Sequence, residues 1–166
     1  RGVVQAAAIF ADAAAARQNS ASFARVLAPK LAVAEALEAL TIKDPLHLFL
    51  LFSSATTAFG NPGQANYVAA NAALEGIARR RQAEGKPALA VGWGPIADAG
   101  VLTRQSAAAE KLERLSGAKP MAAQEALADL PALIEAGVPV IHVARMGWDS
   151  MQAALPIMAE PAFAAI

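Results

Sequence analysis

Short apolar runs alternate along the chain with longer segments in which apolar residues recur every three to four positions. This alternation predicts β-α-β units around a parallel sheet, an α/β fold, rather than a helical bundle or a β-sandwich. Strands are expected at 3–9, 47–52, 88–91 and 138–143, and helices at 20–41, 64–84, 107–115, 122–136 and 149–155.

Two of the predicted helices carry residues that set their ends or bend them. The first helix has Ser20 or Ser22 as its expected N-cap. Pro29 is expected to kink that helix or to start a new segment, because proline cannot donate a backbone hydrogen bond. The helix at 64–84 ends in a cationic turn at 79–81, which is expected to complement the helix dipole and face water.

Composition and charge narrow the class of protein. The 166 residues allow one compact domain, and 56% apolar with 17% charged residues supply a core, which excludes intrinsic disorder. Fourteen basic residues balance fourteen acidic ones, so no global charge attracts nucleic acid or an anionic membrane surface. The uncharged stretch from Pro45 to Leu74 is interrupted by polar residues and is not expected to span a membrane.

The scarcity of metal-binding residues excludes several kinds of site. The sequence has no cysteine and two histidines, which excludes disulfides, iron–sulfur clusters, thiolate zinc ligation and a three-histidine zinc site. No metal site is expected, and the absence of cysteine suits the reducing cytoplasm. The start at Arg1 shows no signal-peptide pattern, and the chain is interpreted as a piece of a longer protein.

The candidates for chemistry follow the predicted strands, because ligands bind beyond the carboxyl ends of strands in a parallel α/β sheet. Tyr67 is the only tyrosine and lies in the first turn of its helix, four residues before Asn71, so both share one helix face. Ser54 ends the preceding predicted strand. A phenol, a hydroxyl and an amide that meet at a strand end suit the binding and protonation of a carbonyl oxygen.

From spacing alone, plainer interpretations stay open. Spacing alone favours packing and capping roles for Tyr67 and Ser54, and it favours a solvated lysine at Lys30. His47 and His142 are interpreted as structural, since neither has a neighbouring pattern of carboxylates.

Three motifs stand out along the chain: L-L-F-S-S at 50–54, G-N-P-G-Q-A-N-Y-V-A-A-N-A at 60–72 and V-G-W-G-P at 91–95. Together they resemble the ketoreductase domain of bacterial modular polyketide synthases, a branch of the short-chain dehydrogenase/reductase superfamily. The flanking segments G-V-V-Q-A-A-A at 2–8, F-A-R-V-L-A-P-K at 23–30 and V-I-H-V-A-R-M-G-W at 140–148 are similar to the same family. The resemblance implies a Rossmann-like, doubly wound parallel sheet.

The resemblance also implies a catalytic set. Tyr67 would be the general acid toward the ketone oxygen, Ser54 would hydrogen-bond that oxygen, and Lys30 would lower the pKa of the tyrosine and hold the nicotinamide ribose. Asn71 stands where most short-chain dehydrogenases keep their lysine, an exchange typical of polyketide ketoreductases. The expected cofactor-binding residues are Ala6, Ala7, Ala8, Ser53, Lys30, Tyr67, Gly94, Pro95 and Ile96.

Further expectations concern the substrate. Asp12, Phe59 and Gln64 are candidates for substrate and stereochemical control, and the segment 96–119 resembles the family's lid over the acyl-pantetheine groove. The implied function is NADPH-dependent reduction of a β-ketoacyl thioester on acyl carrier protein. The alternatives are a non-catalytic structural domain of a polyketide synthase and a free-standing short-chain dehydrogenase, against which the Lys30 and Asn71 arrangement argues.

The largest departure from the family is the absence of its glycine-rich T-G-x-x-G-x-x-G turn, which seats the cofactor's pyrophosphate. The 166 residues are therefore expected to form the C-terminal part of a ketoreductase domain, with the N-terminal half and other synthase domains as partners. Gln5 and Ala8 replace the usual His and Gly. The stereochemical motif Leu-Asp-Asp is represented by F-A-D at 10–12, which retains its last Asp.

Overall fold

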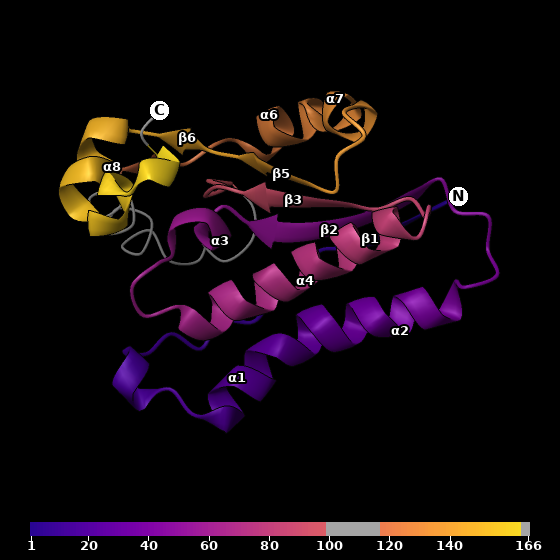
Figure 1. Ribbon diagram of the computed structural model, residues 1–166, viewed down its shortest axis with the longest axis horizontal. Helices are drawn as coiled ribbons and strands as arrows, with labels where there is room; N and C mark the ends of the chain where they lie inside the picture. Colours follow the sequence, from indigo (N-terminus) through magenta and orange to yellow (C-terminus); the bar gives the residue numbers. More distant parts are fainter. Residues whose placement is uncertain (99–116, 164–166) are drawn as a thin grey trace. The chain divides into compact units, whose positions relative to one another are not determined.

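The computed structural model describes residues 1–98 and 117–163, and its main sheet has the predicted parallel arrangement (Figure 1). The strand order is β1-β2-β3-β5, and β1 and β2 pair in parallel with Gly2 opposite Leu48 and Gln5 opposite Leu51. The strands are β1 (Gly2–Gln5), β2 (Leu48–Ser54), β3 (Leu89–Trp93) and β5 (Val140–Val143). The predicted α/β, Rossmann-like fold is confirmed, although the first strand is shorter than expected.

The chain forms two compact units, which are described separately. One comprises Arg1–Gly92 with Gly137–Ile141, and the other comprises Trp93–Ala136 with His142–Ile166. The predicted helix at 107–115 and all but the ends of the expected lid at 96–119 lie outside the described residues.

In the first unit, the expected long helix at 20–41 is three consecutive segments. These are α1 (Ser20–Leu27), the π-helical turn η2 (Ala28–Ala32) and α2 (Val33–Leu40). Neither predicted serine is the N-cap: Asn19 caps α1, its side chain accepting from the Ser22 amide while the Ser22 hydroxyl accepts from the Asn19 amide. The disruption expected at Pro29 is present as the π turn, a feature that is common at functional sites.

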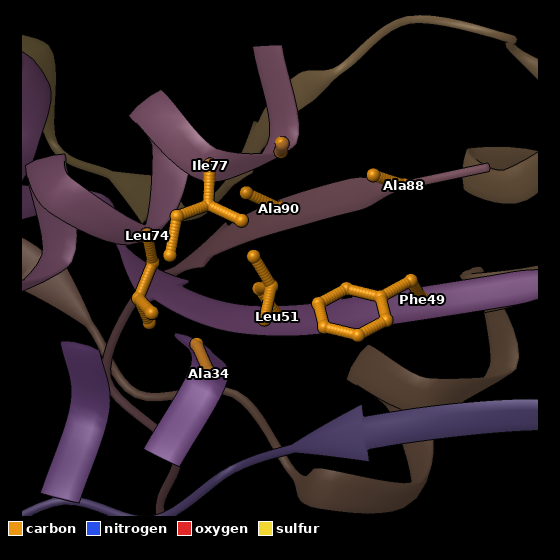
Figure 2. Packing of buried hydrophobic residues seen from close by; sticks show 8 residues of the cluster. Ala34, Phe49, Leu51, Leu74, Ile77, Ala88 and Ala90 are labelled. Atoms are coloured by element: carbon orange, nitrogen blue, oxygen red, sulfur yellow. The ribbon is translucent and has the colours of Figure 1, made fainter. Parts of the chain in front are cut away.

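The hydrophobic core of the first unit lies between β2 and the helices that cover it (Figure 2). Residues alternate along a strand, so Phe49 and Leu51 point to the same face of β2, where Leu74 and Ile77 of α4 (Ala65–Ala83) meet them. Ala34 of α2 joins the same cluster. The core therefore fixes α4, and with it the residues of its first turns, against the end of β2.

The cationic turn at 79–81 is only partly as predicted. Arg80 is exposed and pairs with Glu38 of α2, but Arg81 is buried. The Arg81 guanidinium lies 4.1 Å from the centroid of the Phe49 ring and 3.2 Å from Glu38. The prediction that all three arginines face water was wrong for Arg81, because the apolar stem and planar head of arginine pack well on an aromatic ring.

The first unit also contains two short elements, η1 (Ala15–Arg17) and α3 (Thr56–Phe59). The second unit holds a two-stranded antiparallel sheet that was not predicted, formed by β4 (Ala118–Lys119) and β6 (Arg145–Met146). Its helices are α6 (Ala123–Ala128), α7 (Leu130–Glu135), α8 (Trp148–Ala154), η4 (Pro156–Ala159) and η5 (Pro161–Phe163).

The single helix expected at 122–136 is divided between α6 and α7. Pro131 is the second residue of α7, so it has no amide proton for the carbonyl four residues earlier, and its ring would clash with that carbonyl. The helix is interrupted at Asp129, and a new one starts there. Among the helices of the described residues, none is long and apolar enough to cross a membrane.

Gly94, which follows β3, is required by close packing in the second unit. A Cβ atom at this position would lie 2.9 Å from the Ala144 Cβ and 3.0 Å from its Cα. We expect Gly94→Ala to lower the free energy of unfolding by about 1–3 kcal/mol, because the backbone of Ala144 must move. Urea denaturation measures this loss.

Gly76 provides the matched control for this substitution. It lies in the interior of α4, where an added Cβ meets nothing within 4 Å. Gly76→Ala is expected to raise the free energy of unfolding by about 0.5–1 kcal/mol. Equal effects of the two substitutions would contradict the packing argument.

Candidate active site

The end of β2 and the first turns of α4 bring Ser54 and Tyr67 into one cluster. Ser54 is the last residue of β2 and is buried. Its hydroxyl oxygen accepts from the Thr56 hydroxyl at 2.9 Å and from the Thr56 amide at 3.3 Å, contacts made by the short helix α3. With its oxygen serving as acceptor, the Ser54 hydroxyl proton is available to donate elsewhere.

Tyr67 is held at the start of α4 by contacts from the loop after β1. Its amide donates to the Asn66 side-chain oxygen at 2.8 Å, and the Asn66 side-chain nitrogen donates to the Ala11 carbonyl at 2.8 Å. The Phe10 ring stacks on the Tyr67 ring, with centroids 4.6 Å apart and planes inclined by 26°. The phenol is therefore fixed by its own helix and by a segment more than fifty residues earlier in the chain.

Lys30 reaches the same cluster from the π turn. Its side chain is buried, and its Nζ donates to the Phe52 carbonyl at 2.8 Å and lies 5.6 Å from the centroid of the Tyr67 ring. The Gln5 side-chain nitrogen donates to the Pro29 carbonyl at 2.8 Å, which links the π turn to the end of β1. Lys30 is thus not the solvated lysine that spacing alone allowed.

Asn71 is fully buried one helical turn after Tyr67. Its Nδ2 donates to the Tyr67 carbonyl at 2.8 Å, while its Oδ1 has no hydrogen-bond partner among the described residues. Gln5 Oε1 is a second buried acceptor of this kind. Unpaired buried acceptors are costly, so both mark places where a donor is needed.

Burial shifts the pKa values of Tyr67 and Lys30. Burial raises the pKa of the Tyr67 phenol; the nearby Asn71 and Ser54 side chains lower it, and the negative charge of Asp12 raises it. Burial lowers the pKa of the Lys30 ammonium from 10.5 to about 8. A phenol that keeps its proton beside a cation suits a proton donor at neutral pH.

Asp12 and Gln64, two of the three candidates for substrate and stereochemical control, lie at the edge of this cluster, where the charge of Asp12 acts on Tyr67. The Gln64 side-chain nitrogen donates to Asp12 Oδ2 at 2.9 Å, and Asn61 donates to Gln64 Oε1 at 2.8 Å. The Ala13 amide also donates to the Gly63 carbonyl at 2.9 Å, so two loops are joined in front of α4. Phe59 is the last residue of α3 and is half-buried.

The expected cofactor-binding residues fall in both units. Ala6, Ala7 and Ala8 follow β1 and are exposed, as a binding edge requires. Ser53 instead directs its hydroxyl to Glu75 at 2.8 Å, which leaves only its backbone for a cofactor.

Gly94, Pro95 and Ile96 belong to the second unit. Gly94 donates to the Val143 carbonyl at 2.8 Å, and Ile96 pairs with Met121. Their contact with nicotinamide stays a prediction.

Several residues of the cluster were not assigned from the sequence. In the sequence, Phe10 stands out only as part of the F-A-D motif at 10–12, and residue spacing does not point to Asn66, Thr56 or Thr57. Glu75 had a detectable signal, because it is a carboxylate on a helix face otherwise occupied by Asn71, Leu74 and Ala78. In the described part of the chain, no group of three or more His, Asp or Glu side chains is arranged to hold a metal ion.

Comparison with known proteins shows the family of this chain. The family model of the KR domain matches residues 1–98, which include every residue of the cluster. The chain belongs to this family. The ketoreductase sequence is 40% identical over 147 residues to the polyketide synthase GfsA of Streptomyces halstedii, covering 89% of the chain. It is also 44% identical over 115 residues to the phthioceranic/hydroxyphthioceranic acid synthase of Mycobacterium tuberculosis, covering 69%.

Solved structures give the same family. The ketoreductase from the first module of phoslactomycin biosynthesis in Streptomyces sp. HK803 superposes with a TM-score of 0.88, at 32% identity over 99% of this chain. The chain spans 38% of that structure's length, 2% of GfsA and 5% of the mycobacterial synthase. It is therefore similar to one portion of much longer polyketide synthases, in the ketoreductase branch of the short-chain dehydrogenase/reductase superfamily.

Proposed function

We propose that this chain carries the proton-transfer site of a ketoreductase that reduces a β-ketoacyl thioester, bound to acyl carrier protein through phosphopantetheine, to the β-hydroxyacyl thioester with NADPH. The observation that supports this most is that the side chains of Ser54, Asn71 and Lys30 lie around the phenol of Tyr67. A purely structural domain has no physical need for a buried lysine beside a buried tyrosine, because burying an ammonium is costly.

The proposed mechanism follows from the positions of the protons. The ketone oxygen becomes negative as hydride, supplied by bound nicotinamide, reaches the carbonyl carbon. The Tyr67 phenol gives its proton to that oxygen, and the Ser54 hydroxyl donates a hydrogen bond to the same oxygen. The Lys30 ammonium stabilises the phenolate that remains, since an opposite charge favours the ionised form of a neighbouring group.

The chain's own residues fit part of a nicotinamide dinucleotide. Lys30 and the small residues Ala6 to Ala8 would hold the ribose, and the buried acceptors Asn71 Oδ1 and Gln5 Oε1 suit donors supplied by a ligand or by water. Gly94, Pro95 and Ile96 are proposed to contact the nicotinamide. The sequence has no glycine-rich turn for the pyrophosphate, so we propose that residues outside these 166, in the N-terminal half of the domain, hold it.

We also propose which residues contact the substrate. Asp12, Phe59 and Gln64 would guide the acyl chain toward Tyr67, with the hydrogen bond between Asp12 and Gln64 joining the two loops that flank the phenol. Acyl carrier protein and the other synthase domains are the proposed partners.

Calorimetric titration with NADPH separates the contributions of this chain and of the rest of the domain. We expect the complete ketoreductase domain to bind NADPH with a micromolar Kd and to oxidise it when a β-ketoacyl thioester is added. The 166 residues alone are expected to bind at least about 100-fold more weakly, a loss of about 3 kcal/mol, because they lack the pyrophosphate turn.

Titration with NADH is the control for cofactor choice, and weaker binding is expected. Micromolar binding of NADPH by the 166 residues alone would contradict the divided site. A complete domain that binds NADPH but turns over no β-ketoacyl thioester would contradict the proposed function and favour the non-catalytic alternative.

A further inference from the structure

Glu75 is a buried carboxylate that the proposed mechanism does not use. It lies on α4, one helical turn beyond Asn71 and two beyond Tyr67, and is 4% exposed. A buried carboxylate is retained only where hydrogen bonds or opposite charge compensate for its lost hydration. Its partners therefore show what holds it there.

One oxygen of Glu75 joins two segments on either side of Ser54. Glu75 Oε1 accepts from the Ser53 hydroxyl at 2.8 Å and from the Thr57 hydroxyl at 2.6 Å. The other oxygen lies 3.5 Å from the largely exposed guanidinium of Arg79. Because a single carboxylate oxygen accepts from both hydroxyls, both segments are tied to the same point of α4.

The two hydroxyls bracket Ser54 along the chain. Ser53 is the preceding residue on β2, and Thr57, in the first turn of α3, also lies 2.9 Å from the Ser54 carbonyl. Ser53 shares the face of β2 that carries Phe49 and Leu51, the face that α4 covers. Its hydroxyl therefore meets α4, and it also lies 3.4 Å from the Asn71 carbonyl.

From this geometry we propose that Glu75 is a positioning residue for the ketoreductase reaction: by tying Ser53 and Thr57 to α4, it fixes the Ser54 hydroxyl relative to Tyr67. Ser54 ends β2, and the contacts of its hydroxyl come from Thr56 of the following turn, so the placement of that turn also decides where the hydroxyl lies. Tyr67 and Asn71 are already fixed by α4 itself. The inference rests on the proposed function, because it assigns Glu75 to the same reaction.

The expected effect is on the chemical step rather than on binding. In the complete ketoreductase domain, Glu75→Leu removes the shared acceptor and is expected to lower kcat by about 10- to 100-fold, because a misplacement of about 1 Å has consequences of that size. The partners of Glu75 described above are the hydroxyls of Ser53 and Thr57 and the guanidinium of Arg79, none of which is proposed to hold the ribose. The Kd for NADPH and the KM for the thioester are therefore expected to stay within about twofold of the wild-type values. The pH at which activity declines on the alkaline side is expected to stay the same.

Conservative and partner variants separate positioning from folding. Glu75→Gln keeps an oxygen acceptor of the same reach and is expected to restore kcat to within about fivefold of the wild-type domain. Ser53→Ala and Thr57→Val each remove one donor and are expected to lower kcat by smaller factors. Combined with Glu75→Leu, neither is expected to add its full effect, since residues of one hydrogen-bond network are not additive.

Glu38→Leu is the matched control. Glu38 is another carboxylate of the first unit, and it pairs with Arg80 and Arg81 near the C-terminal end of α4. Its loss is expected to lower the Tm while leaving kcat per cofactor-binding site within about twofold. If the role of Glu75 were only structural, Glu75→Leu would also lower the Tm and leave kcat within about twofold.

The outcomes are distinguishable from failure of the proposed function. The positioning role is overturned if the wild-type domain is active and the Glu75→Leu domain, binding NADPH at full stoichiometry, has a kcat within threefold of the wild-type value. If Glu75→Leu does not fold, unchanged kcat in both Ser53→Ala and Thr57→Val overturns it. If the wild-type domain is itself inactive, the crystal structure of the Glu75→Leu domain decides, and an unmoved Ser54 hydroxyl contradicts the proposal.

Discussion

Tyr67→Phe in the complete ketoreductase domain is expected to lower kcat by more than tenfold, and the reason is the single oxygen atom that it removes. Phenylalanine keeps the ring that stacks on Phe10 and faces the Lys30 ammonium, so the local packing is retained. The acid that neutralises the alkoxide is lost, and a loss above tenfold corresponds to more than about 1.4 kcal/mol in the barrier. Stopped-flow oxidation of NADPH measures it.

Binding supplies the internal control for this substitution. The Kd for NADPH is expected to change by less than about threefold, because the ribose contacts proposed for Lys30 do not need the phenol oxygen. Phe10→Leu tests the ring stack separately, since it leaves the Tyr67 proton in place. Retention of more than about a tenth of the activity by Tyr67→Phe would exclude Tyr67 as the acid.

Lys30→Met is expected to abolish most turnover and to stabilise the folded domain at pH 7, two opposite effects from one group. The pKa of Lys30 is lowered by burial to about 8, so at neutral pH the fold holds an ammonium that would be better hydrated in the unfolded chain. A depression of this size corresponds to about 3 kcal/mol. Methionine fills a similar volume without charge, and loss of the 2.8 Å hydrogen bond to Phe52 offsets part of the gain.

The pH dependence of stability has a definite sign. Between about pH 8 and the unfolded value of 10.5, the unfolded chain binds a proton at Lys30 that the folded chain has released. The free energy of unfolding of the wild-type domain should therefore rise with pH above 8, and the advantage of Lys30→Met should shrink. Urea denaturation at pH 7, 8 and 9 measures the trend, because Tyr67, whose ordinary pKa is 10.0, stays mostly protonated in the unfolded chain over that range.

Activity is expected to follow the opposite course. The ammonium that stabilises the phenolate is lost as pH rises through about 8, so kcat/KM of the wild-type domain should decline on the alkaline side. Lys43→Met, at an exposed lysine, is the control and is expected to leave both stability and the pH profile unchanged. A wild-type profile that stays flat up to pH 10 would contradict the role of Lys30.

The sequence by itself determined the features that depend on short spacings. Strand and helix periods predicted the α/β fold, and the four-residue interval between Tyr67 and Asn71 placed them one turn apart on α4, because local geometry fixes such relations whatever the rest of the chain does. The family resemblance, carried by contiguous motifs, added Lys30 to the set. Where a boundary depended on a competing local contact, as at the Asn19 cap, the prediction was wrong.

Only the tertiary structure decided which distant side chains meet. Phe10 stacks on Tyr67, Lys30 is buried through a π turn, Glu75 bridges Ser53 and Thr57, and Arg81 packs on Phe49. Each of these contacts joins residues from different elements, and its stability comes from enclosure by the whole fold, which lowers the local dielectric and makes every unpaired polar group costly. Residue spacing carries no record of that enclosure, so the polar partners of the site became visible only in three dimensions.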